Sequence, residues 1–114
     1  MSVITTHILD TSRGSPAQGV SVTLEWERTP GHWQKISNKL TNQDGRVPDL
    51  WPKDKALKKG TYSLTFETKN YFLSQGIPCF YPSITIVFEI LRPNEHHHVP
   101  LLLSPFGYST YRGS

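Results

Sequence analysis

Apolar and polar residues alternate along much of this 114-residue chain, and that period of two constrains its fold more than any other feature. Successive side chains of a β-strand point to opposite faces, so the alternation predicts strands with one buried face. The clearest runs are Val20–Glu27, Tyr62–Glu67, Ile84–Ile90 and Val99–Leu103, and weaker ones are Ile4–Thr11, Trp33–Thr41, a piece near Val47 and Tyr108–Arg112.

Turn-forming residues separate these runs. Thr29-Pro30-Gly31, Asn42-Gln43-Asp44-Gly45 and Ser104-Pro105-Phe106-Gly107 are three of the segments that favour turns. The one helix that we expect is short, Lys69–Gln75, and Gly76 would end it. Short strands with regular turns and almost no helix predict an all-β antiparallel sandwich or barrel, formed by a single domain over residues 1–114.

Composition excludes several classes of protein. The net charge is only +3, and the one basic run, residues 53–59, is interrupted by Asp54 and has no interleaved aromatic residue. A solvated loop is therefore expected there rather than a nucleic-acid site. No apolar run approaches the ~20 residues of a membrane helix, and no secretion signal is visible.

The compartment is indicated by one cysteine and the tail. Cys79 is the single cysteine, so the fold has no intrachain disulfide, which suits a reducing compartment. The ending 111–114 is not a Ser-Lys-Leu type peroxisomal signal. We expect a cytoplasmic protein that binds neither nucleic acid nor a membrane, with a peroxisomal location left open.

Three consecutive histidines precede the last clear strand. At a spacing of two, His96 and His98 project together from the outer face of a sheet, whereas His97 shares the face of Val99 and Leu101, which favour the core. A solvated histidine pair is the simpler interpretation of such a pattern. Imidazoles also bind zinc or copper, but two on one strand are an incomplete ligand set.

Reactive groups occur at three other places in the sequence, and each of them by itself is a weak indication of function. His7 lies in the first expected strand, where a histidine beside the core is the simpler interpretation. Arg46 follows Asp44-Gly45, a common hairpin signal, so a structural role is the default. The tail, residues 108–114, keeps strand-like alternation with hydroxyls and a cation, although a frayed end would explain it too.

Taken together, these stretches resemble the 5-hydroxyisourate hydrolases of the transthyretin-like family over essentially the whole chain. The resemblance rests on Thr5–Asp10, Thr41–Arg46, His96–Pro105 and Tyr108–Ser114, with Phe80-Tyr81-Pro82 also similar. The terminal Tyr-Arg-Gly-Ser is the most specific element, because it is typical of the hydrolases and absent from the hormone carrier transthyretin. One departure is His97, a position that is often aromatic in the family.

The resemblance implies a sandwich of two four-stranded antiparallel sheets with one short helix. It also implies a homotetramer built as a dimer of dimers, with active sites in the channel between the dimers, and neither a cofactor nor a metal. Carried over residue by residue, the catalytic set is His7, Arg46 and His98, and the substrate-binding set is His96, Tyr111, Arg112 and Ser114.

The implied reaction converts 5-hydroxyisourate, formed in urate catabolism, to 2-oxo-4-hydroxy-4-carboxy-5-ureidoimidazoline by general-base activation of water. Imidazole, with an ordinary pKa of roughly 6.5, exchanges protons near neutrality, so either His7 or His98 could be the base. The planar cation of Arg46 suits carbonyl and ring-nitrogen acceptors, and the Ser114 hydroxyl can orient water. Two alternatives are a transthyretin-like carrier of small ligands and a metal-binding β-protein.

Overall fold

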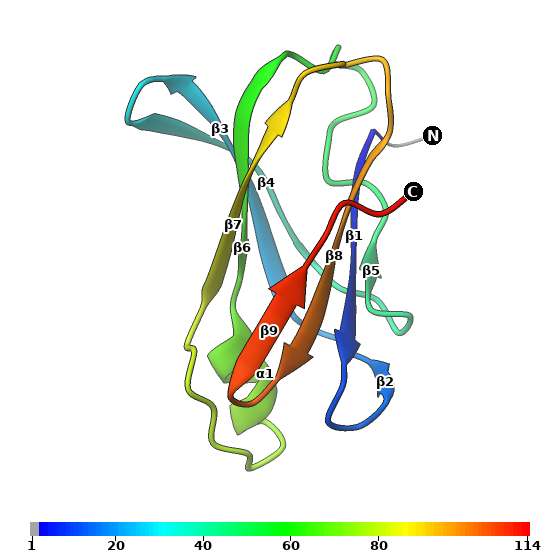
Figure 1. Cartoon of the computed structure of the whole chain (residues 1–114), viewed down its shortest axis with the longest axis vertical. Helices are drawn as coiled ribbons and strands as arrows, with labels where there is room; N and C mark the ends of the chain where they lie inside the picture. Colours follow the sequence, from blue (N-terminus) through cyan, green and yellow to red (C-terminus); the bar gives the residue numbers. More distant parts are fainter. Residues whose placement is uncertain (1–2) are drawn as a thin grey trace.

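The computed structural model describes residues 3–114, which form two β-sheets packed face to face (Figure 1). One sheet contains β1 (Ile4–Asp10), β2 (Ser15–Pro16), β5 (Arg46–Val47), β8 (His97–Ser104) and β9 (Gly107–Thr110). The other contains β3 (Ser21–Thr29), β4 (His32–Leu40), β6 (Gly60–Phe66) and β7 (Ile84–Ile90), and one short helix, α1 (Thr68–Leu73), follows β6. The predicted all-β sandwich with one short helix is confirmed.

Two details of the first sheet differ from the expectation. Its order is β2-β1-β8-β9, and β5 also pairs with β1, so the sheet has five strands. β1 and β8 are parallel, whereas every other pairing is antiparallel. Between β1 and β8 the chain forms the strands of the second sheet. The alternation of apolar and polar residues does not indicate in which direction a later strand of the first sheet runs.

The core lies between the inner faces of the sheets. Tyr62, Leu64 and Phe66 of β6 are fully buried, as are Ile8 of β1 and Leu101 of β8 on the opposite sheet. Each such side chain stabilises the fold by about 1.5–3 kcal/mol relative to exposure. The apolar residues of the alternating runs thus form the core, and the residues between them face outward.

Helix α1 is fixed to the first sheet by a buried carboxylate. Asp10, at the end of β1, is fully buried and accepts a hydrogen bond of 2.7 Å from the Tyr71 hydroxyl. Ser12 donates to the same carboxylate from its backbone N–H at 3.0 Å. These bonds offset the cost of burying the carboxylate. Within residues 3–114, no helix is long and apolar enough to cross a membrane.

His97 faces the core, as its place in the alternation predicts. Its side chain is only 5% exposed, and within the described residues its Nδ1 has no hydrogen-bond partner. Burial lowers the pKa of His97, and the nearby Arg112 cation lowers it further. An unpaired buried ring nitrogen is a source of instability rather than of stability.

Replacing His97 with phenylalanine is expected to stabilise the protein by about 1 kcal/mol, because an apolar ring removes the unpaired nitrogen. The gain should grow as the pH falls below 6.5, since the unfolded histidine then binds a proton that the folded one resists. Urea unfolding at pH 8 and pH 5.5 measures both effects. His32→Phe, on the exposed β4, is the control. A less stable His97→Phe protein would contradict the prediction.

Candidate active site

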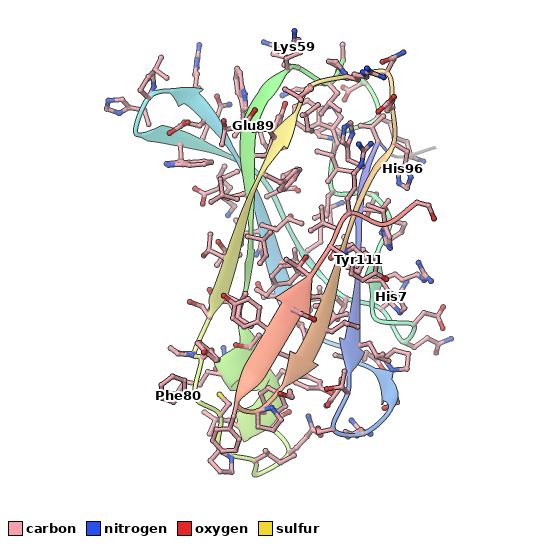
Figure 2. All side chains as sticks on the ribbon, in the orientation of Figure 1. His7, Lys59, Phe80, Glu89, His96 and Tyr111 are labelled. Atoms are coloured by element: carbon pink, nitrogen blue, oxygen red, sulfur yellow. The ribbon has the colours of Figure 1, made fainter. Side chains whose placement is uncertain are left out.

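The parallel pairing of β1 with β8 places reactive side chains on the outer face of the first sheet. In this register Thr5 lies opposite His98. Thr5 and His7 alternate with the buried Ile4 and Ile8, so they face outward, and His98 faces outward because it follows the buried His97. Figure 2 shows His7 and His96 on this side of the sandwich.

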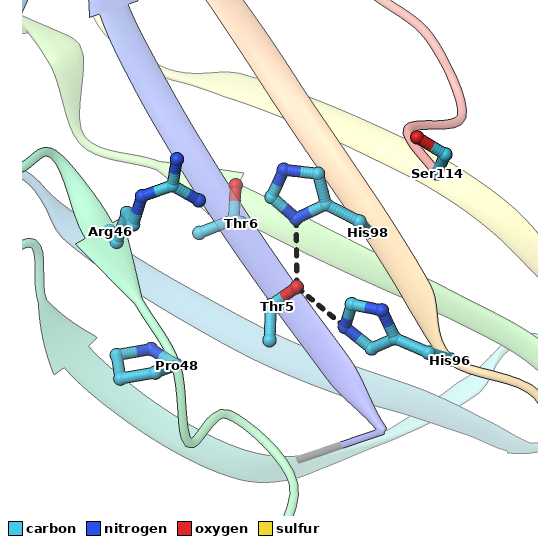
Figure 3. A pocket seen from close by; sticks show the side chains of 7 residues that line it. All are labelled: Thr5, Thr6, Arg46, Pro48, His96, His98 and Ser114. Carbon is cyan, nitrogen blue, oxygen red and sulfur yellow. Dashed lines mark hydrogen bonds between the residues drawn. The ribbon is translucent and has the colours of Figure 1, made fainter. Parts of the chain in front are cut away.

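A single hydroxyl joins two of the histidines. Thr5 Oγ1 lies 2.7 Å from His98 Nδ1 and 2.9 Å from His96 Nε2 (Figure 3). The rings of His96 and His98 are stacked, with centroids 6.2 Å apart and planes inclined by 23°. The predicted projection of His96 and His98 to the same face is therefore confirmed.

The turn before β5 brings Arg46 to the same face, because His7 pairs with Arg46 across β1 and β5. The Asn42 carboxamide oxygen accepts a hydrogen bond of 3.0 Å from the Arg46 N–H, which holds the turn closed. Gly45 has a φ of +72° and approaches the Ile8 backbone so closely that a Cβ would collide with it. The Asp-Gly signal is thus structural, as expected, and its consequence is the placement of Arg46.

The chain returns to this face after β9. The Gly113 N–H donates to the His98 carbonyl oxygen at 2.9 Å, which sets the tail beside β8. Arg112 Nη2 lies 3.3 Å from Glu95 Oε1 and donates to the His96 carbonyl oxygen at 3.3 Å. These contacts place Ser114 at the edge of the histidine pair (Figure 3).

These groups line an open cavity of about 440 Å³, a volume within the usual range for small-molecule sites. It is lined by Thr5, Thr6, Arg46, Pro48, His96, His98 and Ser114. No Asp or Glu side chain is among these lining residues, so the cavity is suited to a polar or anionic ligand. Among residues 3–114, the Arg46 side chain has no hydrogen bond or salt bridge, which leaves its donors available to such a ligand.

Three predicted site residues lie outside this lining. His7 is next to Arg46 in the strand pairing but does not line the cavity. Tyr111 and Arg112 line a neighbouring hollow between β7 and β9, and Tyr111 is 58% exposed. The structure therefore brings Arg46, His96, His98 and Ser114 together and leaves these three at the periphery of a single chain.

Burial and the Arg46 cation favour neutral imidazoles. Burial lowers the pKa of His98, and the charges of Arg46, His96 and His7 lower it further. Burial followed by the Arg46 charge also lowers the pKa of His7, against smaller opposing effects from Asp44. A neutral imidazole has one ring nitrogen free to accept a proton, so His98 is a competent base at neutral pH.

The sequence alone indicates no role for Thr5, although it stands in one of the stretches that carry the resemblance. Alternation alone puts Thr5 on the face of His7, but only the parallel register places it against His98. Within the part of the chain that the structure describes, no group of three or more His, Cys, Asp or Glu side chains is placed to hold a metal ion.

Fold and site together define a transthyretin-like sandwich with a histidine- and arginine-lined cavity on one sheet. The chain belongs to the HIUase/Transthyretin family, whose sequence profile it matches over residues 4–113. It is 48% identical over 113 residues to a 5-hydroxyisourate hydrolase of Salmonella typhimurium, an alignment that covers 99% of this chain and 82% of the relative.

Two solved structures show the same fold. The 5-hydroxyisourate hydrolase of Klebsiella pneumoniae is 39% identical, with a TM-score of 0.86 and full coverage of both chains. Sea bream transthyretin in complex with thyroxine is 30% identical, with a TM-score of 0.89 and coverage of 97% of this chain and 94% of the other. The backbone therefore does not separate a hydrolase from a carrier, and the side chains of the site must do so.

Proposed function

We propose that this protein is a hydrolase that opens the ring of 5-hydroxyisourate with water, a step in the degradation of urate. The observation that carries the proposal is the convergence of Arg46, His96, His98 and Ser114 on one cavity, from three separate segments of the chain. Higher sequence identity to the hydrolases, 48% and 39%, than to the transthyretin, 30%, supports it as well.

The groups of the cavity supply what ring hydrolysis requires. Water attacks the carbonyl carbon of the six-membered ring, and neutral His98 takes the proton that the water loses. Arg46 donates to the oxygen on which negative charge develops, and its planar fork orients the ring. The proton then passes from His98 to the ring nitrogen as the C–N bond breaks. Ser114 orients the water or a ring oxygen.

His98, rather than His7, is the base in this proposal. His98 lines the cavity and is held by Thr5, whereas His7 lies beside Arg46 in the strand pairing and does not line the cavity. His7 keeps its place in the proposed catalytic set through its neighbour, because the β1–β5 pairing sets it beside Arg46. His96, Tyr111 and Arg112 complete the proposed substrate-binding set from the cavity wall and its periphery.

Turnover distinguishes the hydrolase from a carrier of small ligands. Freshly prepared 5-hydroxyisourate should lose its ultraviolet absorbance at a rate proportional to protein concentration, and the total amount converted should be independent of that concentration. A carrier would instead shift the ligand spectrum and saturate at one equivalent per site. Saturation without turnover would refute the hydrolase and favour the carrier.

We also propose a homotetramer, a single hydrolase domain over residues 1–114 and a cytoplasmic location. The outermost strands β7 and β9 leave open sheet edges that a second copy could extend. The one core cluster supports a single domain, although residues 1 and 2 lie outside the described part of the chain. A single cysteine is consistent with a reducing compartment. A sedimentation mass four times the 13.0 kDa of one chain would test the assembly.

A further inference from the structure

We propose that Thr5 is a positioning residue that fixes the proton of His98 on Nδ1 and so leaves Nε2 free to act as the base. The inference rests on the proposed hydrolase function. Its physical basis is the single hydroxyl that lies within hydrogen-bond distance of two ring nitrogens, 2.7 Å from His98 Nδ1 and 2.9 Å from His96 Nε2.

A hydroxyl has one hydrogen to donate and two lone pairs that accept. If Thr5 donates to His96, it must accept from a protonated His98 Nδ1, and His98 Nε2 is then unprotonated. If Thr5 donates to His98 instead, His98 Nε2 must carry the proton, and the ring has no free nitrogen facing the cavity. The direction of one hydroxyl therefore decides whether neutral His98 can accept a proton from water.

Arg46 favours the first arrangement. Figure 3 shows the second ring nitrogen of His98 turned away from Thr5, toward the side of the cavity from which Arg46 enters. Arg46 and His98 line the same cavity, and the arginine charge acts on the His98 ring. A cation is better accommodated by a lone pair on the facing nitrogen than by an N–H group, which places the proton of His98 on Nδ1.

The hydrogen bonds of the first arrangement are also kept when His98 accepts a proton. When His98 takes the proton of water on Nε2, its Nδ1–H still donates to Thr5, and Thr5 still donates to His96. His96 is exposed, so water can satisfy its other nitrogen in either tautomer. The direction of the Thr5 hydroxyl therefore matters for the tautomer of His98, whose Nδ1 is directed at Thr5, and not for that of His96.

Thr5 is well built for this role. The β1–β8 register fixes its backbone directly opposite His98, and the residue is only half-buried, so its hydroxyl reaches the cavity rather than the core. Its β-branched side chain is stiff at χ1, which limits the directions that the hydroxyl can take. Serine in its place would keep the hydroxyl, and valine would keep the shape without the hydroxyl.

The test compares Thr5→Val and Thr5→Ser with the wild-type protein. Thr5→Val should lower kcat by about 10- to 100-fold with little change in KM, because the wrong tautomer removes the base and not the binding groups. Thr5→Ser should restore most of kcat. Thr85→Val is the matched control, because Thr85 pairs its hydroxyl with Thr65 on the other sheet, away from the cavity.

Nitrogen-15 NMR of the histidine rings gives a readout that does not depend on activity. Wild-type His98 should be in the Nδ1–H form at pH 8, Thr5→Val should mix the tautomers, and Thr5→Ser should restore the first form. A wild-type His98 protonated on Nε2, or a Thr5→Val protein with unchanged kcat and tautomer, would overturn the inference. If the tautomer depends on Thr5 but the wild type shows no turnover, the positioning stands and the proposed function fails.

Discussion

Replacing His98 with asparagine is expected to lower kcat by about 10² to 10⁴, the range typical of removing a general base. The asparagine amide can still donate to Thr5 from near the position of Nδ1, so the wall of the cavity should stay ordered. What is lost is the nitrogen that takes the proton of water. Stopped-flow or conventional ultraviolet kinetics on fresh substrate measure the change.

The pH profile of the wild type adds a second check on His98. The base must be neutral to work, and burial together with Arg46 lowers its pKa below 6.5. The value of kcat/KM should therefore be level above pH 6.5 and fall only at more acidic pH, as His98 becomes protonated. His32→Asn, at an exposed position of β4, should keep both rate and profile. A His98→Asn rate within about threefold of the wild type would remove His98 from the chemistry.

The strands were predictable because alternation is a local property of the sequence. β3, β6 and β7 coincide with the clearest alternating runs, and even the two-residue β5 falls at Val47 as expected. The parallel direction of β8 beside β1 was not predictable, because it depends on the path of the chain through the second sheet between them. Pairing between distant strands is fixed by packing of the whole core.

The site, like the strands, was predictable where it depends on local patterns in the sequence. The spacing of His96 and His98 is enough to place both imidazoles on one face of a strand, and the Asp-Gly turn locates Arg46 at a strand entrance. Thr5 could not be assigned, because its role exists only in the register with His98. Arg112 stays a predicted substrate contact: in the single chain it lies outside the cavity lining, with its Nη2 3.3 Å from Glu95 Oε1.

The division between core and outer face explains how the same sandwich can occur in a hydrolase and in a transthyretin that binds thyroxine. The residues that hold the sheets together point inward, whereas His7, Arg46 and His98 point outward and contribute little to the core. Substitutions on the outer face can therefore change chemistry without loss of the fold. This is consistent with a high TM-score to a transthyretin that shares only 30% of the sequence.

The last glycine of the chain provides the second large expected effect, because it is packed directly against the proposed base. A Cβ at position 113 would lie 2.5 Å from His98 Cδ2 and 3.3 Å from Pro100 Cγ. The φ of Gly113 is not positive, so space rather than backbone conformation requires glycine here. Gly113→Ala must then either turn the His98 ring away from Thr5 or lift the tail that carries Ser114.

Either response disturbs the site, so Gly113→Ala is expected to lower kcat/KM by about 10²-fold, the cost of misplacing a catalytic group by about 1 Å. The melting temperature should change little, because the residue is next to the chain end. Gly107→Ala is the matched control, since its nearest neighbour, Ser104 Oγ, would be 3.7 Å away in ordinary contact. If Gly113→Ala kept the kcat/KM of the wild type, the tail would not pack on His98 during catalysis. That result would also contradict the proposed role of Ser114.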